Sequence, residues 1–235
     1  MLIKAVQRLT VIDFPGKLAC TFFLFGCNFR CSFCHNPELV VRNNTIGISA
    51  DEALAFLVSH RQYLDGVCFT GGEPLITLDK EFVKKVKALG YAIKIDTNGS
   101  FPERLQEFIA EGLVDYVAMD VKTTKEKYAS LVGAPVDLKK LERSMQLIAA
   151  LPAYEFRCTV IPGHHSLADI EEMKQWLLSV TKKEKLQSFF VQGFVARPGA
   201  MVSDVLDATR SPTVEELSAM ENLLQSSFEQ VEVRA

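Results

Sequence analysis

Three cysteines stand close together near the start of the chain, at Cys27, Cys31 and Cys34, in a C-x3-C-x2-C spacing. Thiolates at this spacing can converge on one metal centre while a fourth coordination position stays empty. Structural zinc sites normally close with four Cys or His ligands, and electron-transfer iron–sulfur clusters normally use four cysteines. The triplet therefore predicts a 4Fe-4S cluster in which one iron is open to a small molecule.

A zinc site is the alternative interpretation of the same triplet. It would need a fourth ligand, and the only local one is His35, which is adjacent to Cys34 and poorly placed. The other cysteines lie on apolar stretches that predict buried strands: Cys20, Cys68 and Cys158. A non-catalytic iron–sulfur or zinc-binding protein thus stays open as a function of a different class.

The cysteine spacing resembles the signature of the radical S-adenosylmethionine (radical SAM) superfamily, in which the amino and carboxylate groups of S-adenosylmethionine chelate the open iron. Cys34-His35-Asn36 and the upstream Thr10-Val11-Ile12-Asp13-Phe14-Pro15-Gly16 are similar to the activating enzymes of glycyl-radical enzymes. The run from Leu9 to Val40 resembles in particular the activating proteins of anaerobic ribonucleoside-triphosphate reductase.

This resemblance implies an oxidoreductase that cleaves S-adenosylmethionine reductively to a 5′-deoxyadenosyl radical. The radical would abstract hydrogen from a glycine of a partner glycyl-radical enzyme, with anaerobic ribonucleoside-triphosphate reductase as the expected partner. A flavodoxin or ferredoxin-type protein is the expected electron donor, and no catalytic side chain is expected beyond the cluster and its ligands. The alternative within the same superfamily is an enzyme that acts on a small molecule or nucleotide.

The resemblance also assigns residues to the S-adenosylmethionine site. Gly71 and Gly72 would let the backbone approach the methionine part of the ligand, and the Glu73 carboxylate would accept hydrogen bonds from its amino group. Lys122 would pair with the ligand's carboxylate. Where some activases carry a histidine near the adenosine, this sequence has Gln192. The full expected set is Gly71, Gly72, Glu73, Asp96, Thr97, Asn98, Asp120, Lys122, Arg157 and Gln192.

A monovalent cation, Na+ or K+, is a further cofactor implied by the resemblance. Its ligands would be the side chains of Asp96, Thr97 and Asp120 and the carbonyl oxygen of Val121, because oxygen-only ligation suits a hard cation. The alternative is that the two aspartates cap loops.

Several neighbouring residues have two interpretations each. Phe29 and Phe33 would shield the cluster from water or simply pack. His35 and Asn36 match the activase pattern and would either have a catalytic role or brace the cysteine loop by hydrogen bonds. Arg157 lies in an apolar strand and needs an anionic partner, either the ligand or a structural carboxylate. The adjacent histidines of a Pro-Gly loop, His164 and His165, are expected to be exposed.

The elements that must position these residues alternate between strands and helices, and each predicted strand ends in a polar motif. The apolar run Leu18–Phe25 lacks alternation, as expected for a parallel strand covered on both faces. Ser49 and Glu52 form a capping box that starts a helix. Six βα repeats predict an α/β fold, an open partial (β/α)6 TIM-like barrel, since a closed barrel needs eight; the resemblance implies the same. The further strands are 67–70, 91–96, 114–121, 154–161 and 187–194, with flanking strands 2–10 and 231–234; the helices are 49–63, 78–89, 102–110, 137–150, 166–180 and 213–228, the last opened by Pro212.

Length and composition set the remaining expectations. The chain has 235 residues, 48% of them hydrophobic, which suits one domain spanning residues 1–235. The sequence contains no run of about 18 apolar residues, so no membrane span is expected. A formal net charge of −3 gives no general attraction to nucleic acid or anionic membranes. Six cysteines, three of them clustered, suit a reducing compartment, so a cytoplasmic location is expected.

Overall fold

The computed structural model describes residues 1–40, 47–197, 201–206 and 208–234. The chain forms two compact units that are interleaved along the sequence, so the prediction that residues 1–235 form a single domain stays a prediction. Unit 1 comprises Met1–Asn28, Glu38–Thr97 and Phe101–Val117; unit 2 comprises Phe29–Pro37, Asn98–Ser100 and Ala118–Ala235.

Among the described residues of unit 1 the strands follow one another in chain order; the first strand pairing is antiparallel and the next two are parallel. The second strand is buried along almost its whole length, as a parallel strand covered on both faces should be. The turn before it closes with a hydrogen bond from the Lys17 N–H to the Phe14 carbonyl at 3.1 Å. The strands are β1 (Ile3–Thr10), β2 (Ala19–Leu24), β3 (Gly66–Gly71) and β4 (Ala92–Thr97), and β5 (Tyr116–Asp120) begins in this unit.

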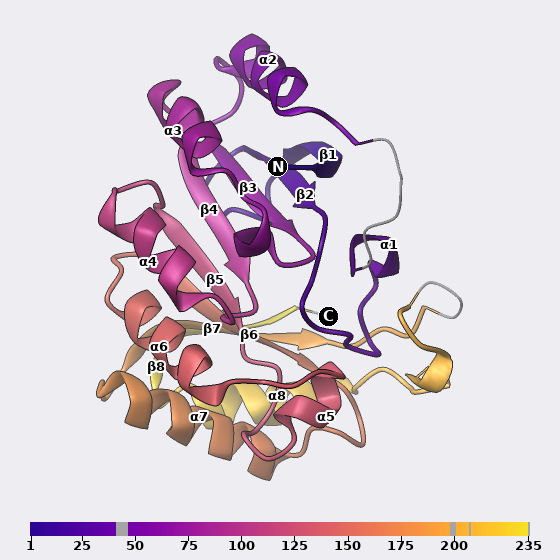
Figure 1. Ribbon diagram of the computed structural model, residues 1–235. Coiled ribbons are helices and arrows are strands. Elements are labelled where there is room, and N and C mark those ends of the chain that lie inside the picture. Colours follow the sequence, from indigo (N-terminus) through magenta and orange to yellow (C-terminus); the bar gives the residue numbers. More distant parts are fainter. Residues whose placement is uncertain (41–46, 198–200, 207, 235) are drawn as a thin grey trace. The chain divides into compact units, whose positions relative to one another are not determined.

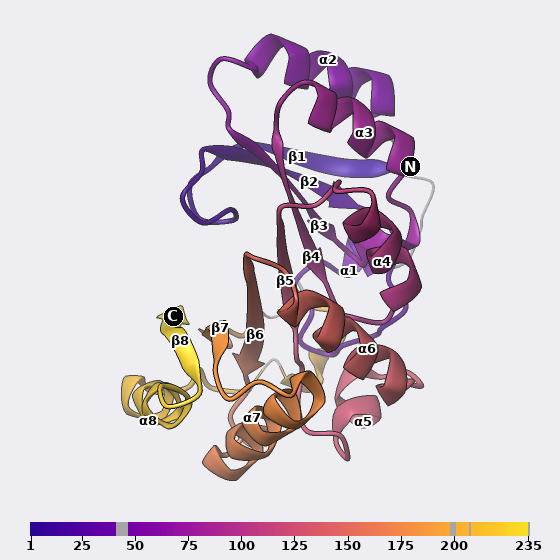
Figure 2. The ribbon, with the colours of Figure 1, turned by 90° about the vertical axis from the view of Figure 1, so that its left-hand side faces the viewer.

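The helices of unit 1 begin where the chain supplies capping side chains. The capping box predicted at Ser49 and Glu52 is confirmed: the Glu52 N–H donates to the Ser49 hydroxyl at 3.2 Å, and the Glu52 carboxylate accepts from the Ser49 N–H at 2.8 Å. The helices are α1 (Pro37–Val40), whose first residue belongs to unit 2, α2 (Ala50–His60), the 3-10 turn η1 (Pro74–Ile76), α3 (Lys80–Ala88) and α4 (Pro102–Ala110). Helices α2, α3 and α4 lie along the same side of the strands of this unit (Figures 1 and 2).

Unit 2 repeats the alternation, and the strand pairings among its described residues are parallel and again in chain order. Helix α6 packs against α7, and α7 packs against α8, so these helices form a layer beneath their strands (Figure 2). Its elements are α5 (Tyr128–Val132), α6 (Leu138–Ala149), β6 (Tyr154–Val160), α7 (Leu167–Thr181), β7 (Leu186–Gly193), the 3-10 turn η2 (Asp204–Leu206), α8 (Val214–Leu224) and β8 (Phe228–Arg234).

The predicted bounds of the last helix are wrong at both ends. Pro212 does not open the helix, because Thr213 is its N-cap: the Thr213 hydroxyl accepts the Glu216 N–H at 3.2 Å. The helix ends at Leu224 rather than at Phe228, which opens β8 and places its ring 5.2 Å from that of Phe189 on β7. Burial of this aromatic pair favours a strand where helical periodicity alone predicts continuation.

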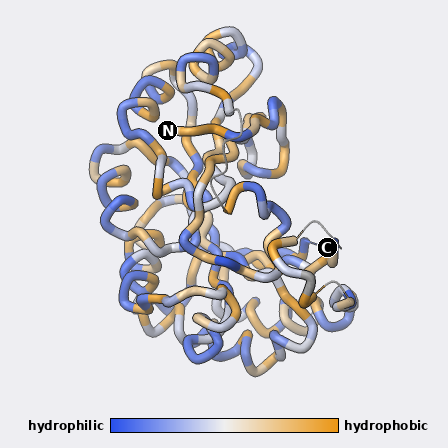
Figure 3. Tube along the Cα trace, turned by 45° about the vertical axis from the view of Figure 1, so that its right-hand side comes forward, coloured by the Kyte–Doolittle hydropathy of each residue, from blue (hydrophilic) through white to orange (hydrophobic). Residues whose placement is uncertain are grey.

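The α/β class with a mostly parallel open sheet is confirmed. The three cysteines outside the triplet are fully buried on strands, as predicted: Cys20 on β2, Cys68 on β3 and Cys158 on β6. In Figure 3 the tube alternates between hydrophilic and hydrophobic colours along the helices, which is typical of helices that bury one face. Within the described ranges, none of the helices combines the length and the apolar character that crossing a membrane requires.

Candidate active site

The turn after β3 is held against the residue that precedes Cys27. The Glu73 N–H donates to the Gly26 carbonyl at 2.7 Å, and the Gly26 N–H donates to the Leu39 carbonyl at 2.8 Å. A Cβ atom on Gly72 would lie 2.2 Å from the Gly26 oxygen, so only glycine permits this approach. In this structure Gly72 therefore serves the contact between two backbone segments; its predicted approach to a ligand stays a prediction.

Glu73 joins the ends of two neighbouring strands. Its side chain is fully buried, and its Oε1 accepts hydrogen bonds from the Leu75 N–H at 3.1 Å and from the Thr97 hydroxyl at 2.9 Å. A buried carboxylate oxygen with two donors is well satisfied. Glu73 and Thr97, both predicted to bind S-adenosylmethionine, are thus brought together, and the oxygen that joins them also caps η1.

The other residues after β4 have short-range partners. Asp96, at the end of this strand, forms an ion pair with the nearly fully buried Lys94. In unit 2, Asn98 accepts the Ser100 N–H on its Oδ1 at 2.9 Å. The Asn98 contact shapes the turn after β4. The ion pair of Asp96 lies within the strand, so the loop-capping alternative for Asp96 stays a prediction.

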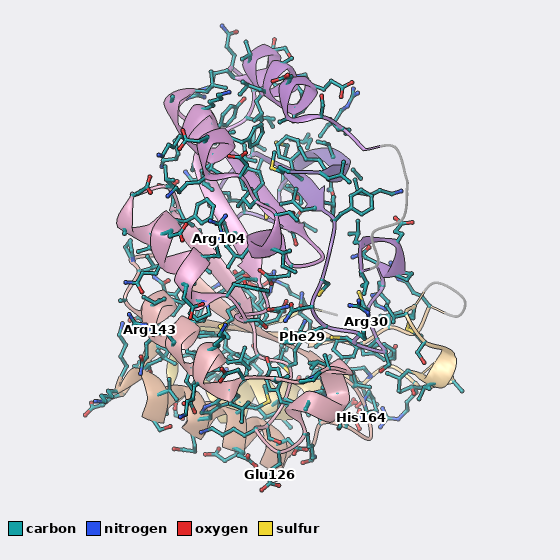
Figure 4. All side chains as sticks on the ribbon, viewed as in Figure 1. Phe29, Arg30, Arg104, Glu126, Arg143 and His164 are labelled. Atoms are coloured by element: carbon teal, nitrogen blue, oxygen red, sulfur yellow. The ribbon has the colours of Figure 1, made fainter. Side chains whose placement is uncertain are left out.

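The cysteine segment, residues 27–34, contains no helix or strand, and backbone hydrogen bonds hold it in place. Cys27 is the penultimate residue of the first stretch of unit 1, whereas Cys31 and Cys34 belong to unit 2. In unit 2 the Arg30 N–H donates to the Val132 carbonyl at 2.8 Å, and the Cys34 N–H donates to the Cys31 carbonyl at 3.1 Å. Figure 4 shows Phe29 and Arg30 at the start of this stretch. These bonds fix the backbone without using the thiols.

The side chains around the cysteines in unit 2 pack as predicted. Phe29 and Phe33 are both buried, and the Phe29 ring lies 6.4 Å from that of Tyr128 in an edge-on arrangement. The His35 Nε2 lies 2.8 Å from the Val195 carbonyl, which confirms that His35 braces this loop. Asn36 is exposed. Cys31 is only 8% exposed.

Asp120, at the end of β5, lies between two cationic side chains. Its carboxylate is 3.2 Å from the Lys122 Nζ and 3.4 Å from the Arg157 Nε, and Arg157 also pairs with the buried Glu155 at 3.6 Å. Burial disfavours the charged form of Lys122, but the negative charges of Asp120 and of Cys31 outweigh it and raise the pKa of Lys122. Three residues predicted to bind the ligand therefore form one charged cluster, and Arg157 has the structural carboxylate partners that were the alternative interpretation.

These ion pairs bear on the proposed monovalent cation. Lys94 neutralises Asp96 in unit 1, and Lys122 with Arg157 neutralises Asp120 in unit 2. Because protein cations already supply the positive charge, these carboxylates need no additional ion for charge balance. Binding of Na+ or K+ stays a prediction.

Two residues that support Lys122 were not identified from the sequence. His165 was expected to be exposed, but it is 7% exposed and its Nε2 lies 2.8 Å from the Lys122 carbonyl; only its neighbour His164 is exposed. Tyr128, the first residue of α5, is fully buried and accepts the Lys122 N–H on its hydroxyl at 3.2 Å. A histidine after Pro-Gly gave no signal of burial, because its partner is 43 residues away in the sequence.

Gln192 lies near the end of β7, opposite Thr159 of β6 and Arg234 of β8, and is partly buried. Its position at the carboxyl end of a parallel strand is the one predicted. Its contact with a ligand stays a prediction.

The sulfur donors fit an iron–sulfur cluster better at the triplet than elsewhere. Burial raises the pKa of Cys20 and of Cys158 to about 12 each, which disfavours the thiolate form that metals bind. Within the ranges described above, no three His, Cys, Asp or Glu side chains are already gathered as a metal site. In unit 2 the side chains of Phe29 and Phe33 near Cys31 are buried, and cysteine thiolates are the donors that an iron–sulfur cluster requires.

Comparison with known proteins places the chain in a family. The model of the radical SAM superfamily matches residues 21–177, and the chain belongs to this superfamily. A protein of Methanocaldococcus jannaschii, named as a proposed glycyl-radical enzyme activating enzyme, is 32% identical over 182 residues, 73% of each chain. The pyruvate formate-lyase-activating enzyme of Listeria monocytogenes is 30% identical over 149 residues, 57% of this chain and 60% of the relative.

A solved structure supports the fold. Streptococcus suis SuiB bound to S-adenosylmethionine superposes with a TM-score of 0.67 over 91% of this chain and 49% of SuiB, at 15% sequence identity. The predicted fold, a mostly parallel open sheet of the partial TIM-like barrel type, is therefore confirmed. The chain is a radical SAM enzyme with relatives among the glycyl-radical enzyme activases, and its family implies a 4Fe-4S cluster and S-adenosylmethionine.

Proposed function

We propose that this protein activates a glycyl-radical enzyme. The observation that carries the proposal is the Cys27, Cys31 and Cys34 triplet in a chain that shares 32% identity over 73% of its length with a relative named for this activity. The chemistry supplied by a bound 4Fe-4S cluster is one-electron cleavage of S-adenosylmethionine to a 5′-deoxyadenosyl radical, which removes a hydrogen atom from a glycine of the partner.

The chain's own residues have distinct roles in this proposal. The three thiolates hold the cluster and leave one iron open. Lys122 and Arg157 attract the ligand's carboxylate, and Asp120 holds both cations in place, since the side chains already pair at 3.2 and 3.4 Å. Phe29 and Phe33 keep water from the sulfur of Cys31. The Glu73 carboxylate and Thr97 border the amino group of the ligand.

The expected partner is anaerobic ribonucleoside-triphosphate reductase, and the electron is expected from a flavodoxin or ferredoxin-type donor in the cytoplasm. The partner rests on the resemblance of residues 9–40 to activators of that reductase. The pyruvate formate-lyase-activating enzyme of Listeria monocytogenes is a relative over 149 residues, so pyruvate formate-lyase is the comparison partner in the test.

The test is anaerobic reconstitution followed by reduction with S-adenosylmethionine and the reductase, monitored by electron paramagnetic resonance. The proposal predicts a glycyl-radical signal and, when the partner is labelled with α-deuterated glycine, deuterium in the 5′-deoxyadenosine product. Formation of 5′-deoxyadenosine without a glycyl radical in either partner would contradict the activase function and favour a small-molecule or nucleotide substrate. One zinc per chain and no sulfide would contradict the radical chemistry itself.

A further inference from the structure

The backbone of Lys122 is held by two side chains from elsewhere in unit 2. The N–H of Val121 still bonds to β6, donating to the Arg157 carbonyl at 2.8 Å. At Lys122 this pairing gives way to side chains: the N–H donates to the Tyr128 hydroxyl at 3.2 Å, and the carbonyl accepts from His165 at 2.8 Å. Both hydrogen-bonding groups of this residue are thus held in place from outside its strand.

The partners of His165 define which ring nitrogen carries the proton. The Ile161 N–H donates to the Nδ1 at 3.1 Å, so the Nδ1 must be the acceptor and the Nε2 must carry the hydrogen that is donated to Lys122. Burial lowers the pKa of His165, which keeps the ring neutral. In this tautomer the neutral imidazole accepts a hydrogen bond from the β6–α7 loop on one ring nitrogen and donates one to the Lys122 carbonyl from the other.

The hydroxyl of Tyr128 is placed by the packing of its ring. The ring lies 6.4 Å from that of Phe29 and 6.1 Å from that of Trp176, edge-on to each. The hydroxyl lies 3.4 Å from the Asp120 carbonyl, to which it donates. Tyr128 thus connects the stretch that leads into Cys31 with the residues that follow β5.

We propose that His165 and Tyr128 are positioning residues that hold the Lys122 backbone so that its ammonium group faces Asp120 and the carboxylate of S-adenosylmethionine. The inference rests on the proposed function, because that function gives Lys122 its ligand. Neither residue touches the reacting atoms; each acts through a backbone group of Lys122.

Two substitutions at one position separate this role from simple packing. In His165→Gln the amide nitrogen reaches the place of Nε2 and keeps a donor for the Lys122 carbonyl. In His165→Asn the amide oxygen takes the place of Nδ1, which keeps the acceptor for Ile161 but removes the donor. The measurement is the Kd for S-adenosylmethionine by equilibrium dialysis of the reconstituted, unreduced protein, with iron content and melting temperature recorded for each variant.

The expected result is a Kd that rises about tenfold in His165→Asn, the equivalent of one lost hydrogen bond, and a Kd within about threefold of wild type in His165→Gln. The Kd of Lys122→Ala shows how much the Lys122 side chain itself contributes to binding of S-adenosylmethionine. If Lys122→Ala binds S-adenosylmethionine like wild type, the role that the proposed function gives to Lys122 is wrong, and the inference is overturned as well. If Lys122→Ala weakens binding but His165→Asn does not, only the inference is overturned. An equal rise of the Kd in His165→Asn and His165→Gln would show that His165 acts by packing, and would also overturn the inference.

Tyr128→Phe tests the same inference where a His165 variant fails to fold. Phenylalanine keeps the ring contacts and removes only the hydroxyl. Tyr154→Phe is the matched control, because the Tyr154 hydroxyl also accepts a backbone N–H, that of Gln187 at 3.1 Å, away from Lys122. We expect similar losses of stability in both variants but a Kd rise of several-fold in Tyr128→Phe alone. An unchanged Kd in Tyr128→Phe, or an equal rise in both, would overturn the proposal.

Discussion

The carbonyl oxygen of Arg30 lies so close to Gly133 that a Cβ atom on this glycine would be 2.8 Å from it. Gly133 ends α5 with φ +61°, directly after Val132, whose carbonyl accepts the Arg30 N–H. The segment that leads into Cys31 is thus bound by a hydrogen bond and by close backbone contact at the same turn. This pair of contacts gives the irregular cysteine segment a fixed start within unit 2.

Gly133→Ala should therefore lower both the stability of the fold and the iron content after reconstitution. A left-handed alanine costs about 1–2 kcal/mol in itself, and the clash with Arg30 adds to this cost. Gly112→Ala is the matched control, because Gly112 has φ +66° but no atom within 4 Å of an added Cβ. Urea unfolding should show a larger loss of stability in Gly133→Ala, and iron analysis after reconstitution should show lower loading. Equal losses and equal loading in the two variants would show that the contact with Arg30 is unimportant.

Thr97→Val should destabilise the fold by about 1–3 kcal/mol, because it removes the hydroxyl that donates to the fully buried Glu73. Thr123→Val is the control: Thr123 is also fully buried, but its hydroxyl has no hydrogen-bond partner among the described residues. Removing an unsatisfied hydroxyl should be neutral or stabilising. The free energies of unfolding in urea compare the two, and a smaller loss in Thr97→Val than in Thr123→Val would contradict the role given to the Glu73–Thr97 hydrogen bond.

Cys31→Ala should abolish cleavage of S-adenosylmethionine and leave the domain folded. Iron and sulfide should fall well below about four of each per chain, while the far-ultraviolet circular dichroism spectrum should not change. Cys20→Ala should keep its iron, since Cys20 is fully buried on β2 with a pKa raised to about 12. Retained 5′-deoxyadenosine formation in Cys31→Ala would mean that the ligand assignment is wrong.

Stability should fall as the solution becomes acidic, in part because of His165. Burial lowers its pKa below the ordinary value of 6.5, so below pH 6.5 the unfolded chain takes up a proton that the folded chain does not. The contribution of His165 is therefore complete above pH 6.5 and is lost as the pH falls through its folded-state pKa. In His165→Gln the dependence of the unfolding free energy on pH between 7 and 5 should be weaker. An identical slope in wild type and variant would show that the ring is not held neutral.

Local signals in the sequence predicted much of the fold, but they did not predict the side chains that hold the backbone of Lys122. The capping box at Ser49 and the helix Pro102–Ala110 follow from neighbouring residues, and both are confirmed. The end of α8 could not be predicted in this way, because Phe228 leaves the helix to pack on Phe189, a partner 39 residues earlier. The burial of His165 depends on a carbonyl at the end of another strand. Contacts of this kind become visible only when the strands are assembled.

The interleaving of the two units sets an order of events during synthesis. Phe29–Pro37 leaves the ribosome early, but the carbonyl of Val132 that receives the Arg30 N–H follows about 100 residues later, and the Val202 N–H that donates to Cys34 at 3.2 Å comes later still. Closing such long loops is slow and cannot precede translation of the distant partner. The hydrogen bonds that hold the backbone of Arg30 and Cys34 are therefore expected to form only after residues 132 and 202 have been translated, late in the synthesis of the chain.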